Sequence, residues 1–127
     1  MAIRESGENY LEAIFILRRE RGFVRSIDVA CYLGVSKPSV SRAMSILKSE
    51  DYIEIDEDGG ISLTSGGLSV AESMYERHQL LTEYLISLRV NREVAARDAC
   101  RIEHVISAES FERLREHART YIENLNK

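Results

Sequence analysis

SIDVACYLGVSKPSVSRAMSILK, residues 26–48, carries the strongest structural signal in this chain of 127 residues. Its first eight residues have the apolar spacing of a short helix, and Gly34 then breaks the chain. Ser36 can cap a second helix, which we expect over residues 37–51, and Pro38 is tolerated in its first turn. The inward face of this second helix should hold Val40, Met44, Ile46 and Leu47. A short helix, a glycine turn and a second helix are the order of a helix-turn-helix motif.

The segments on either side extend this motif into a winged helix-turn-helix. Residues 5–21 carry apolar side chains every three to four positions, which predicts an amphipathic helix that Gly22 would end. Residues 52–55 and 61–63 alternate between apolar and polar side chains. The turn residues Asp58-Gly59-Gly60 lie between these two runs, so the pair predicts a β-hairpin.

The second half of the chain has only helical periodicity. We expect helices over residues 64–88, over residues 91–106 and after Ser107, which can cap the last one. The predicted fold class is therefore mainly α with a small β-hairpin. A winged helix-turn-helix should occupy residues 1–64, and a helical domain should occupy residues 65–127.

Composition narrows the class of protein. Hydrophobic residues make up 44% of the chain and charged residues 30%, which is typical of a globular protein with a packed core. No apolar run reaches the ~18 residues of a membrane span, and the first residues contain no apolar signal segment. Cys31 and Cys100 are too few for a disulfide framework. We therefore expect a cytoplasmic protein with free thiols and no membrane partner.

The second helix of the motif is the one clearly basic element. Between Lys37 and Lys48 there are three cations and no acidic residue. The net charge of −4 argues mildly against nucleic acid, but only the docking face of a DNA-binding protein must be positive. Polar side chains at the start of this helix can reach phosphates or base edges in a major groove, which predicts DNA contacts by Ser36, Lys37, Ser39, Ser41 and Arg42. The alternative is a solvated helix face in another kind of helical protein.

The predicted wing argues in the opposite direction. Its side chains are acidic and should repel phosphate: Glu54, Asp56, Glu57 and Asp58. If the wing contacts DNA, its backbone around Gly59 and Gly60 must make the contact.

A thiol, a carboxylate and an imidazole recur at i, i+3 and i+4 in Cys100, Glu103 and His104. On a helix these three side chains point to one side, and each is a competent ligand for a divalent transition metal. Simpler interpretations remain open for each residue. Cys100 could be a small core residue, Glu103 could pair with Arg97 or Arg101 on the surface, and His104 could be a satisfied interfacial histidine.

Several stretches together resemble the diphtheria toxin repressor family of metal-dependent regulators, and most closely its short, manganese-transport-regulator type. They follow the family's order and spacing and cover nearly the whole chain: ENYLEAI (8–14), LGVSKPSVS (33–41), Leu63-Thr64 with Gly67, RHQLL (77–81) and ACRIEHVIS (99–107). The resemblance implies a transcriptional repressor that needs Fe²⁺ or Mn²⁺ and that Co²⁺ or Zn²⁺ could also occupy in vitro.

The resemblance also implies a ligand set that spacing alone does not give. The family's metal ligands fall on Asn9, Glu12, His78, Cys100, Glu103 and His104. Periodicity places His78 at the edge of an apolar stripe facing the next helix, but it does not bring Glu12 near Cys100. Asn9 departs from the family, in which Asp or Met holds this position. The positions of a further site in larger relatives are Thr82 and Ala96 here, and the chain lacks residues for their SH3-like domain, so we expect no ancillary site of that type.

The last helix has an apolar stripe that a single chain would struggle to bury. We therefore expect a homodimer whose interface includes Phe111, Leu114 and Ile122. In such a dimer, metal binding would tie the first helix to the metal-binding helices and fix the spacing of the two recognition helices. Two half-sites of a palindromic double-stranded DNA operator, ~34 Å apart, could then be read together.

Two other functions remain as alternatives. One is a winged-helix regulator that responds to a small organic ligand, which operator binding without metal would favour. The other is an enzyme that uses Cys100 and His104 as a thiol–imidazole pair. We expect no enzyme, because both residues lie on one helix and no orienting group or oxyanion donor accompanies them.

Overall fold

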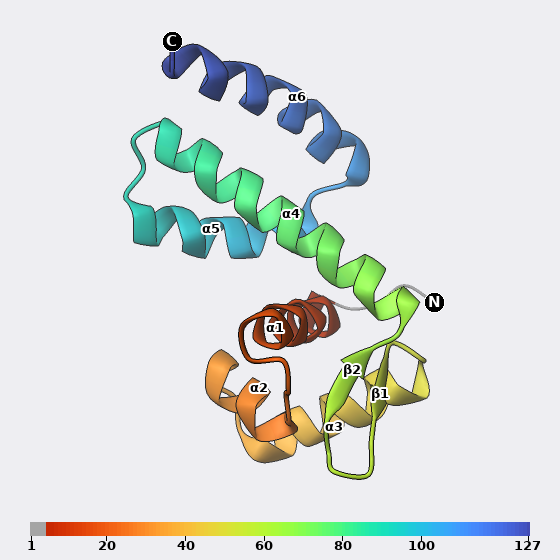
Figure 1. Ribbon diagram of the computed structural model, residues 1–127. Coiled ribbons are helices and arrows are strands. Elements are labelled where there is room, and N and C mark those ends of the chain that lie inside the picture. The colour runs from red at the N-terminus through yellow and green to blue at the C-terminus, as the bar shows by residue number, and fades with distance from the viewer. Residues whose placement is uncertain (1–4) are drawn as a thin grey trace. The chain divides into compact units, whose positions relative to one another are not determined.

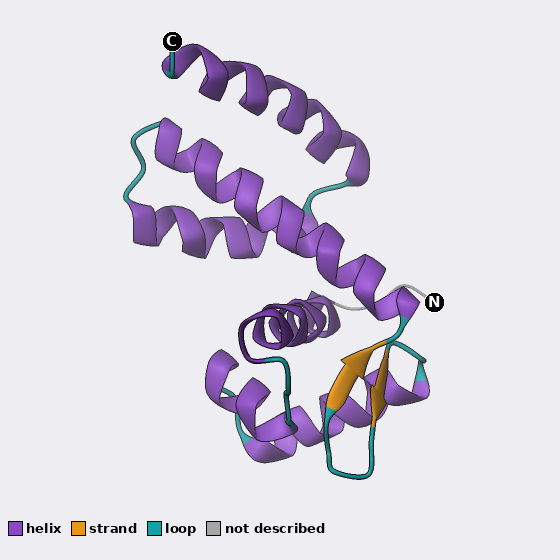
Figure 2. Cartoon of the chain, in the orientation of Figure 1, coloured by secondary structure: helices purple, strands orange, loops and turns teal. Residues whose placement is uncertain are grey.

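A computed structural model describes residues 5–127 of the chain. It divides into two compact units: unit 1 ends at Ser73, and unit 2 is Met74–Lys127. The described residues form six helices and one two-stranded hairpin, which confirms the predicted fold class (Figures 1 and 2). The boundary between the compact units falls inside the long helix α4, Ser65–Ser87. None of the helices in the described part of the chain is long and apolar enough to cross a membrane.

The three helices of unit 1 begin and end close to where local signals place them. They are α1 (Glu5–Arg21), α2 (Ser26–Leu33) and α3 (Lys37–Ser49). Gly34 ends α2 with a φ of 68°, and its N–H donates to the carbonyl of Ala30. This left-handed backbone conformation is common at helix ends, and glycine adopts it without strain. The hydroxyl of Ser36 accepts a hydrogen bond from the backbone N–H of Ser39 at 3.2 Å and caps α3.

The core of unit 1 shows that one inward position was predicted wrongly. Val40, Met44 and Leu47 are each 2% exposed, but Ile46 is 56% exposed. Successive helix residues are rotated by about 100°, so positions 40, 44 and 47 share one side while position 46 points well away from it. The buried face of α3 packs with residues of α1, α2 and the hairpin, among them Leu11, Ile14, Leu17, Val29, Ile53 and Ile61.

The predicted wing is an antiparallel hairpin of β1 (Ile53–Ile55) and β2 (Ile61–Leu63), with Ile53 opposite Leu63. The outer edge of β2 forms hydrogen bonds with other segments of unit 1. The N–H of Ile61 donates to the carbonyl of Val24 at 2.8 Å, and the guanidinium of Arg18 donates to the carbonyl of Ile61 at 2.7 Å. These bonds fix the wing to α1 and to the segment before α2.

A close approach of backbones joins the wing to the start of α4. The hydroxyl of Thr64 donates to the carbonyl of Asp51 at 2.7 Å and accepts from the N–H of Gly67 at 3.1 Å. A Cβ atom at Gly67 would lie 2.0 Å from the carbonyl oxygen of Tyr52. Only glycine fits this position without a shift of the backbone.

Unit 2 contains the rest of α4 together with α5 (Arg92–Val105) and α6 (Ala108–Leu125). In Figure 1 the second half of α4 lies between the other two helices of this unit. The side chain of Asn91 caps α5 and that of Ser107 caps α6. The buried residues of this unit's apolar cluster are Leu81, Ala99 and Phe111, and its half-buried members are Leu80, Ile102, Ile106 and Leu114.

Candidate metal centre and nucleic-acid interface

Glu103 is a buried carboxylate on α5, and no part of it is exposed. Its Oε2 lies 3.0 Å from Nδ1 of His78, and its Oε1 lies 3.4 Å from Nε2 of His104. Among the described residues, Oε1 accepts no hydrogen bond. A buried carboxylate is costly unless a cation or several donors compensate it. The alternative in which Glu103 pairs with Arg97 or Arg101 on the surface is wrong, because Glu103 is buried.

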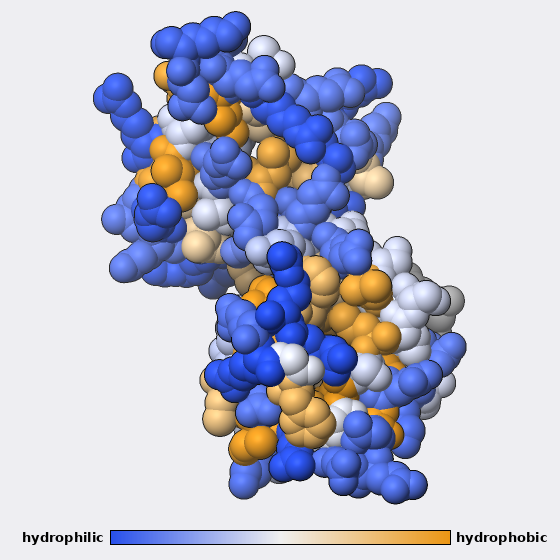
Figure 3. All heavy atoms as spheres, in the orientation of Figure 1, coloured by the Kyte–Doolittle hydropathy of each residue, from blue (hydrophilic) through white to orange (hydrophobic). Residues whose placement is uncertain are grey.

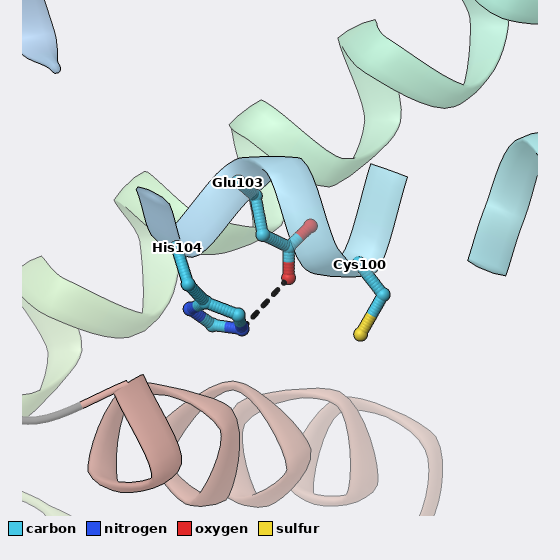
Figure 4. A group of neighbouring side chains, drawn as sticks. All are labelled: Cys100, Glu103 and His104. Atoms are coloured by element: carbon cyan, nitrogen blue, oxygen red, sulfur yellow. Dashed lines mark ion pairs between the residues drawn. The ribbon is translucent and has the colours of Figure 1, made fainter. Parts of the chain in front are cut away.

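Cys100, Glu103 and His104 form one cluster of donor atoms. The sulfur, a carboxylate oxygen and an imidazole nitrogen lie within 4.8 Å of one another. Figure 4 shows the three side chains projecting from the same side of α5, as the i, i+3 and i+4 spacing predicts. The side chain of His104 is 3% exposed, and Cys100 is half-buried and is not part of a disulfide.

His78 brings a fourth donor from α4. It lies four residues after Met74, which is buried, and its own side chain is 28% exposed. Its 3.0 Å contact with Glu103 confirms that it faces α5, the helix that follows α4 in the chain. One thiol, one carboxylate and two imidazoles thus converge within unit 2.

This donor set fits a divalent transition metal. Thiolate and imidazole are ligands for Fe²⁺, Co²⁺ and Zn²⁺, and carboxylate adds the charge that a dication needs. The carboxylate oxygen without a hydrogen bond is the atom that a cation would satisfy. When bound, such an ion would supply positive charge to a buried acidic cluster, and the four side chains would orient it.

The residues predicted to contact DNA lie around the start of α3. Ser36, Lys37, Ser41 and Arg42 are exposed, and Ser39 is half-buried. The hydroxyl of Ser36 donates to the hydroxyl of Ser39 at 2.8 Å, so both serines also stabilise the helix start. Nε of Arg42 lies 3.5 Å from the carbonyl of Pro38. Lys37 and Arg42 therefore project from the first two turns of a helix whose start is fixed by its cap.

Two features of the wing escaped sequence reasoning. Asp56 is not simply a repelling charge, because its Oδ1 accepts hydrogen bonds from the N–H groups of Asp58 and Gly60 at 2.9 and 2.8 Å. The guanidinium of Arg25 stacks over the ring of Phe23 at 5.1 Å, and that ring packs against Gly60. A local aspartate-turn pattern could have suggested the first feature. Nothing in local periodicity indicates the second.

Comparison with known proteins connects this geometry to a family. The family profile described as "Iron dependent repressor, N-terminal DNA binding domain" matches residues 3–61. The profile described as "Iron dependent repressor, metal binding and dimerisation domain" matches residues 64–121. The transcriptional regulator MntR of Escherichia coli O6:H1 is 38% identical over 112 residues, which are 88% of this chain and 72% of the relative. This chain belongs to the diphtheria toxin repressor family of metal-dependent regulators.

Other members of this repressor family agree with the assignment. The HTH-type transcriptional regulator MntR of Bacillus subtilis is 33% identical over 109 residues, covering 86% of this chain and 77% of the relative. The solved structure of the manganese regulator SloR superposes with a TM-score of 0.80 at 28% identity, covering 94% of this chain and 55% of SloR. The chain therefore spans little more than half of the SloR chain.

The family settles which class of function applies. The chain is a metal-dependent transcriptional repressor of the winged-helix type, and its relatives are transcriptional regulators, not enzymes. The profile that matches residues 64–121 describes metal binding, which disfavours the small organic ligand considered from the sequence. The interpretation of Cys100 and His104 as a hydrolytic pair is therefore not supported, and their role as metal ligands stays a prediction.

Two predicted ligands of the repressor lie on α1, in unit 1. Asn9 is half-buried, and Glu12 is 5% exposed. They are three residues apart, so their side chains share one side of the helix. Their participation in the metal centre stays a prediction, which the family resemblance supports.

The predicted dimer-interface residues differ in how much surface they offer. Phe111 is 3% exposed and belongs to the apolar cluster of its own unit, so a partner chain can gain little contact with it. Leu114 and Ile122 are half-buried on α6, and Leu125 is 54% exposed on the same helix. In Figure 3, hydrophilic side chains cover most of the visible surface, and hydrophobic ones reach it in small patches.

Proposed function

We propose that this chain senses Fe²⁺ or Mn²⁺ and, once loaded, binds a palindromic operator as a homodimer. The observation that carries this proposal is the buried Glu103, with two histidines and a cysteine around it. The proposed ligands are Asn9, Glu12, His78, Cys100, Glu103 and His104. The proposed DNA contacts are Ser36, Lys37, Ser39, Ser41 and Arg42.

The donor chemistry favours one of the two metals. Cys100 provides a soft thiolate, which binds Fe²⁺ better than Mn²⁺. The relatives point both ways, since the family is called iron dependent and SloR is called a manganese regulator. We propose that Fe²⁺ binds more tightly here and that Co²⁺ and Zn²⁺ occupy the same donors in vitro.

The switch would work through charge. Glu12, Glu103 and a Cys100 thiolate carry three negative charges, which disfavour a closed arrangement until a divalent cation compensates them. The bound cation would tie α1 to α4 and α5 and so favour the DNA-competent state over the open one. We place the functional boundary between residues 64 and 65, so that α4 belongs with the dimerisation and metal-binding part; the ranges of the two family profiles support this division.

An anaerobic operator titration tests the proposal. Fluorescence anisotropy of a labelled operator fragment is measured with chelator, Mn²⁺, Fe²⁺, Co²⁺ and Zn²⁺ in turn. We expect binding only with metal, and at lower concentrations of Fe²⁺ than of Mn²⁺. Cys100→Ser should reverse that preference, whereas Cys31→Ser, at the other cysteine of the chain, should not change it. Operator binding of equal strength in chelator would exclude metal sensing.

A further inference from the structure

Arg77 of α4 holds the end of α5 by two hydrogen bonds. Its Nη1 atom donates to the carbonyl of Glu103 and to the carbonyl of Ile106, each at 2.9 Å. α5 ends at Val105, so the carbonyl of Glu103 belongs to its last turn, where acceptors lack partners within the helix, and that of Ile106 belongs to its C-cap residue. A positive charge at this end also interacts favourably with the helix dipole.

The guanidinium of Arg77 is itself held in place. It stacks on the ring of Phe111 with its central carbon 5.2 Å from the ring centroid, and Arg115 stacks on the same ring at 5.2 Å. Arg115 forms ion pairs of 2.7 Å with Glu76 of α4 and with Glu112 of α6. Phe111 is 3% exposed, so these stacking contacts are largely shielded from water.

Arg77 and its neighbour His78 therefore contact both the main chain and the side chain of Glu103. Arg77 binds the main-chain carbonyl of Glu103, and His78 contacts its carboxylate at 3.0 Å. Metal sites tolerate errors of only about 0.2 Å in ligand distance. A rotation of α5 about its axis, or a shift of α5 along α4, would therefore change the distance from the metal to every ligand on α5. The side chain of Arg77 also contacts Phe111, and so it connects the end of α5 to α6.

We propose that Arg77 is a positioning residue of the metal centre. It contacts no metal, and it sets the spacing between His78 and the donors on α5 by fixing the backbone at Glu103. This inference rests on the proposed function, because it presumes that those donors bind a metal. A purely structural role, capping α5 for stability, would leave the geometry of the bound ion unchanged.

Co²⁺ provides the readout, because its absorption bands report ligand geometry and its thiolate charge-transfer band reports the bond to Cys100. Arg77→Met and Arg77→Lys are compared with Arg115→Met, a matched control. That control removes the other cation from Phe111 and leaves the carbonyls of α5 bonded. Each protein is titrated with Co²⁺ under anaerobic conditions, and the thermal unfolding of each metal-free protein is recorded.

We expect Arg77→Met to weaken Co²⁺ binding about 10-fold or more, as changes next to metal ligands do, and to alter the absorption bands. Arg77→Lys should recover part of the affinity, because its ammonium can reach one carbonyl. Arg115→Met should keep the wild-type affinity and bands even if it unfolds at a lower temperature. If Arg77→Met does not fold, altered bands in Arg77→Lys carry the test.

Three results would overturn the inference. Wild-type Kd and bands in the folded Arg77 variants would leave Arg77 a purely structural cap. An equal loss of Co²⁺ affinity in Arg115→Met would attribute the effect to general destabilisation of unit 2. If the wild type itself binds no Co²⁺, both the proposed metal centre and this inference are wrong. This result differs from the first two, in which the wild type binds Co²⁺ and only the role of Arg77 is refuted.

Discussion

At the scale of single residues, the burial of the Glu103 carboxylate is the observation that most needs a functional explanation. Its carboxylate is fully buried beside two imidazoles, and one oxygen accepts no hydrogen bond from the described residues. A buried charge that is not fully paired and hydrogen-bonded lowers stability, and a neutral group of the same volume avoids that cost. A bound cation would offset that cost, which is the role that we propose for this carboxylate.

Changing Glu103→Gln should therefore separate stability from metal binding. The amide keeps the size, can still bond to His78 and removes the cost of a buried charge, so the metal-free protein should unfold at the same temperature or a higher one. Metal affinity should fall about 10-fold or more, because the charged ligand is lost. Calorimetry and thermal unfolding measure the two effects, with Glu109→Gln on the exposed start of α6 as control. A clear fall in the unfolding temperature of metal-free Glu103→Gln would mean that the carboxylate is structural.

At the scale of elements, α3 and the wing differ in charge. The cations of α3 are exposed at and after its capped first turn, whereas Glu54, Glu57 and Asp58 are exposed on the wing. DNA affinity depends on neutralised phosphates, so α3 should supply most of it. Asp56 serves the turn of the wing, which explains part of the wing's acidity without any role in binding.

Lys37→Gln and Arg42→Gln should each weaken operator binding. Each change removes one phosphate or base contact and should lower the slope of log affinity against log salt by about 1 if the contact is to phosphate. Metal affinity should not change. The measurement is anisotropy over a range of salt concentrations, with Arg113→Gln on α6 as the control cation. Unchanged operator affinity in both α3 variants would remove α3 from the DNA interface.

The first turn of α4 offers a paired test of backbone packing. Gly67→Ala places a methyl group against the carbonyl of Tyr52 and should destabilise the protein by about 1–3 kcal/mol. At Gly66 the nearest atom to an added Cβ is 3.8 Å away, so Gly66→Ala should be neutral or stabilise by up to about 1 kcal/mol. Urea unfolding of both variants measures the difference. Equal stabilities would contradict the close approach of the two backbones.

At the scale of the whole molecule, the chain joins a DNA-binding part to a metal-binding part within 127 residues. Four of the six proposed ligands lie in unit 2, and Asn9 and Glu12 belong to α1 in unit 1. A ligand set drawn from both units would couple metal binding to the placement of the recognition helices. Coupling of this kind is a difference in metal affinity between two states.

Glu12→Gln tests that coupling. The variant should retain part of its metal affinity, because the unit 2 donors are intact, but it should lose much of the metal-dependent increase in operator affinity. Calorimetry measures the first quantity and anisotropy the second, with Glu20→Gln as an exposed control on the same helix. Wild-type values for both quantities would exclude α1 from the switch while leaving the unit 2 site intact.

Dimerisation can be tested on α6. Ile122 is half-buried and, unlike Phe111, is not part of the apolar cluster of unit 2, so Ile122→Asp should spare the fold. We expect this variant to sediment as a monomer at micromolar concentration, because a charge placed in an apolar interface is costly. Thr120→Asp, on an exposed position of α6, should remain dimeric. A monomeric wild type would refute the interface.

Local signals in the sequence determined the elements and the three residues that α5 contributes to the candidate metal centre. Helix α2 was predicted residue for residue, because Gly34 and Ser36 act on their nearest neighbours. The i, i+3, i+4 spacing of Cys100, Glu103 and His104 likewise needs only one helix. Periodicity also predicted that His78 faces α5, and family resemblance supplied its role as a ligand.

Contacts between distant segments were decided only by the tertiary structure. Arg77 bonds to carbonyls 26 and 29 residues away, and Gly67 meets the backbone of Tyr52. The complete burial of Glu103 and the place of Phe111 in its own unit's core likewise depend on how several helices pack. Helical periodicity describes one face of one helix, and it carries no information about which other segment covers that face.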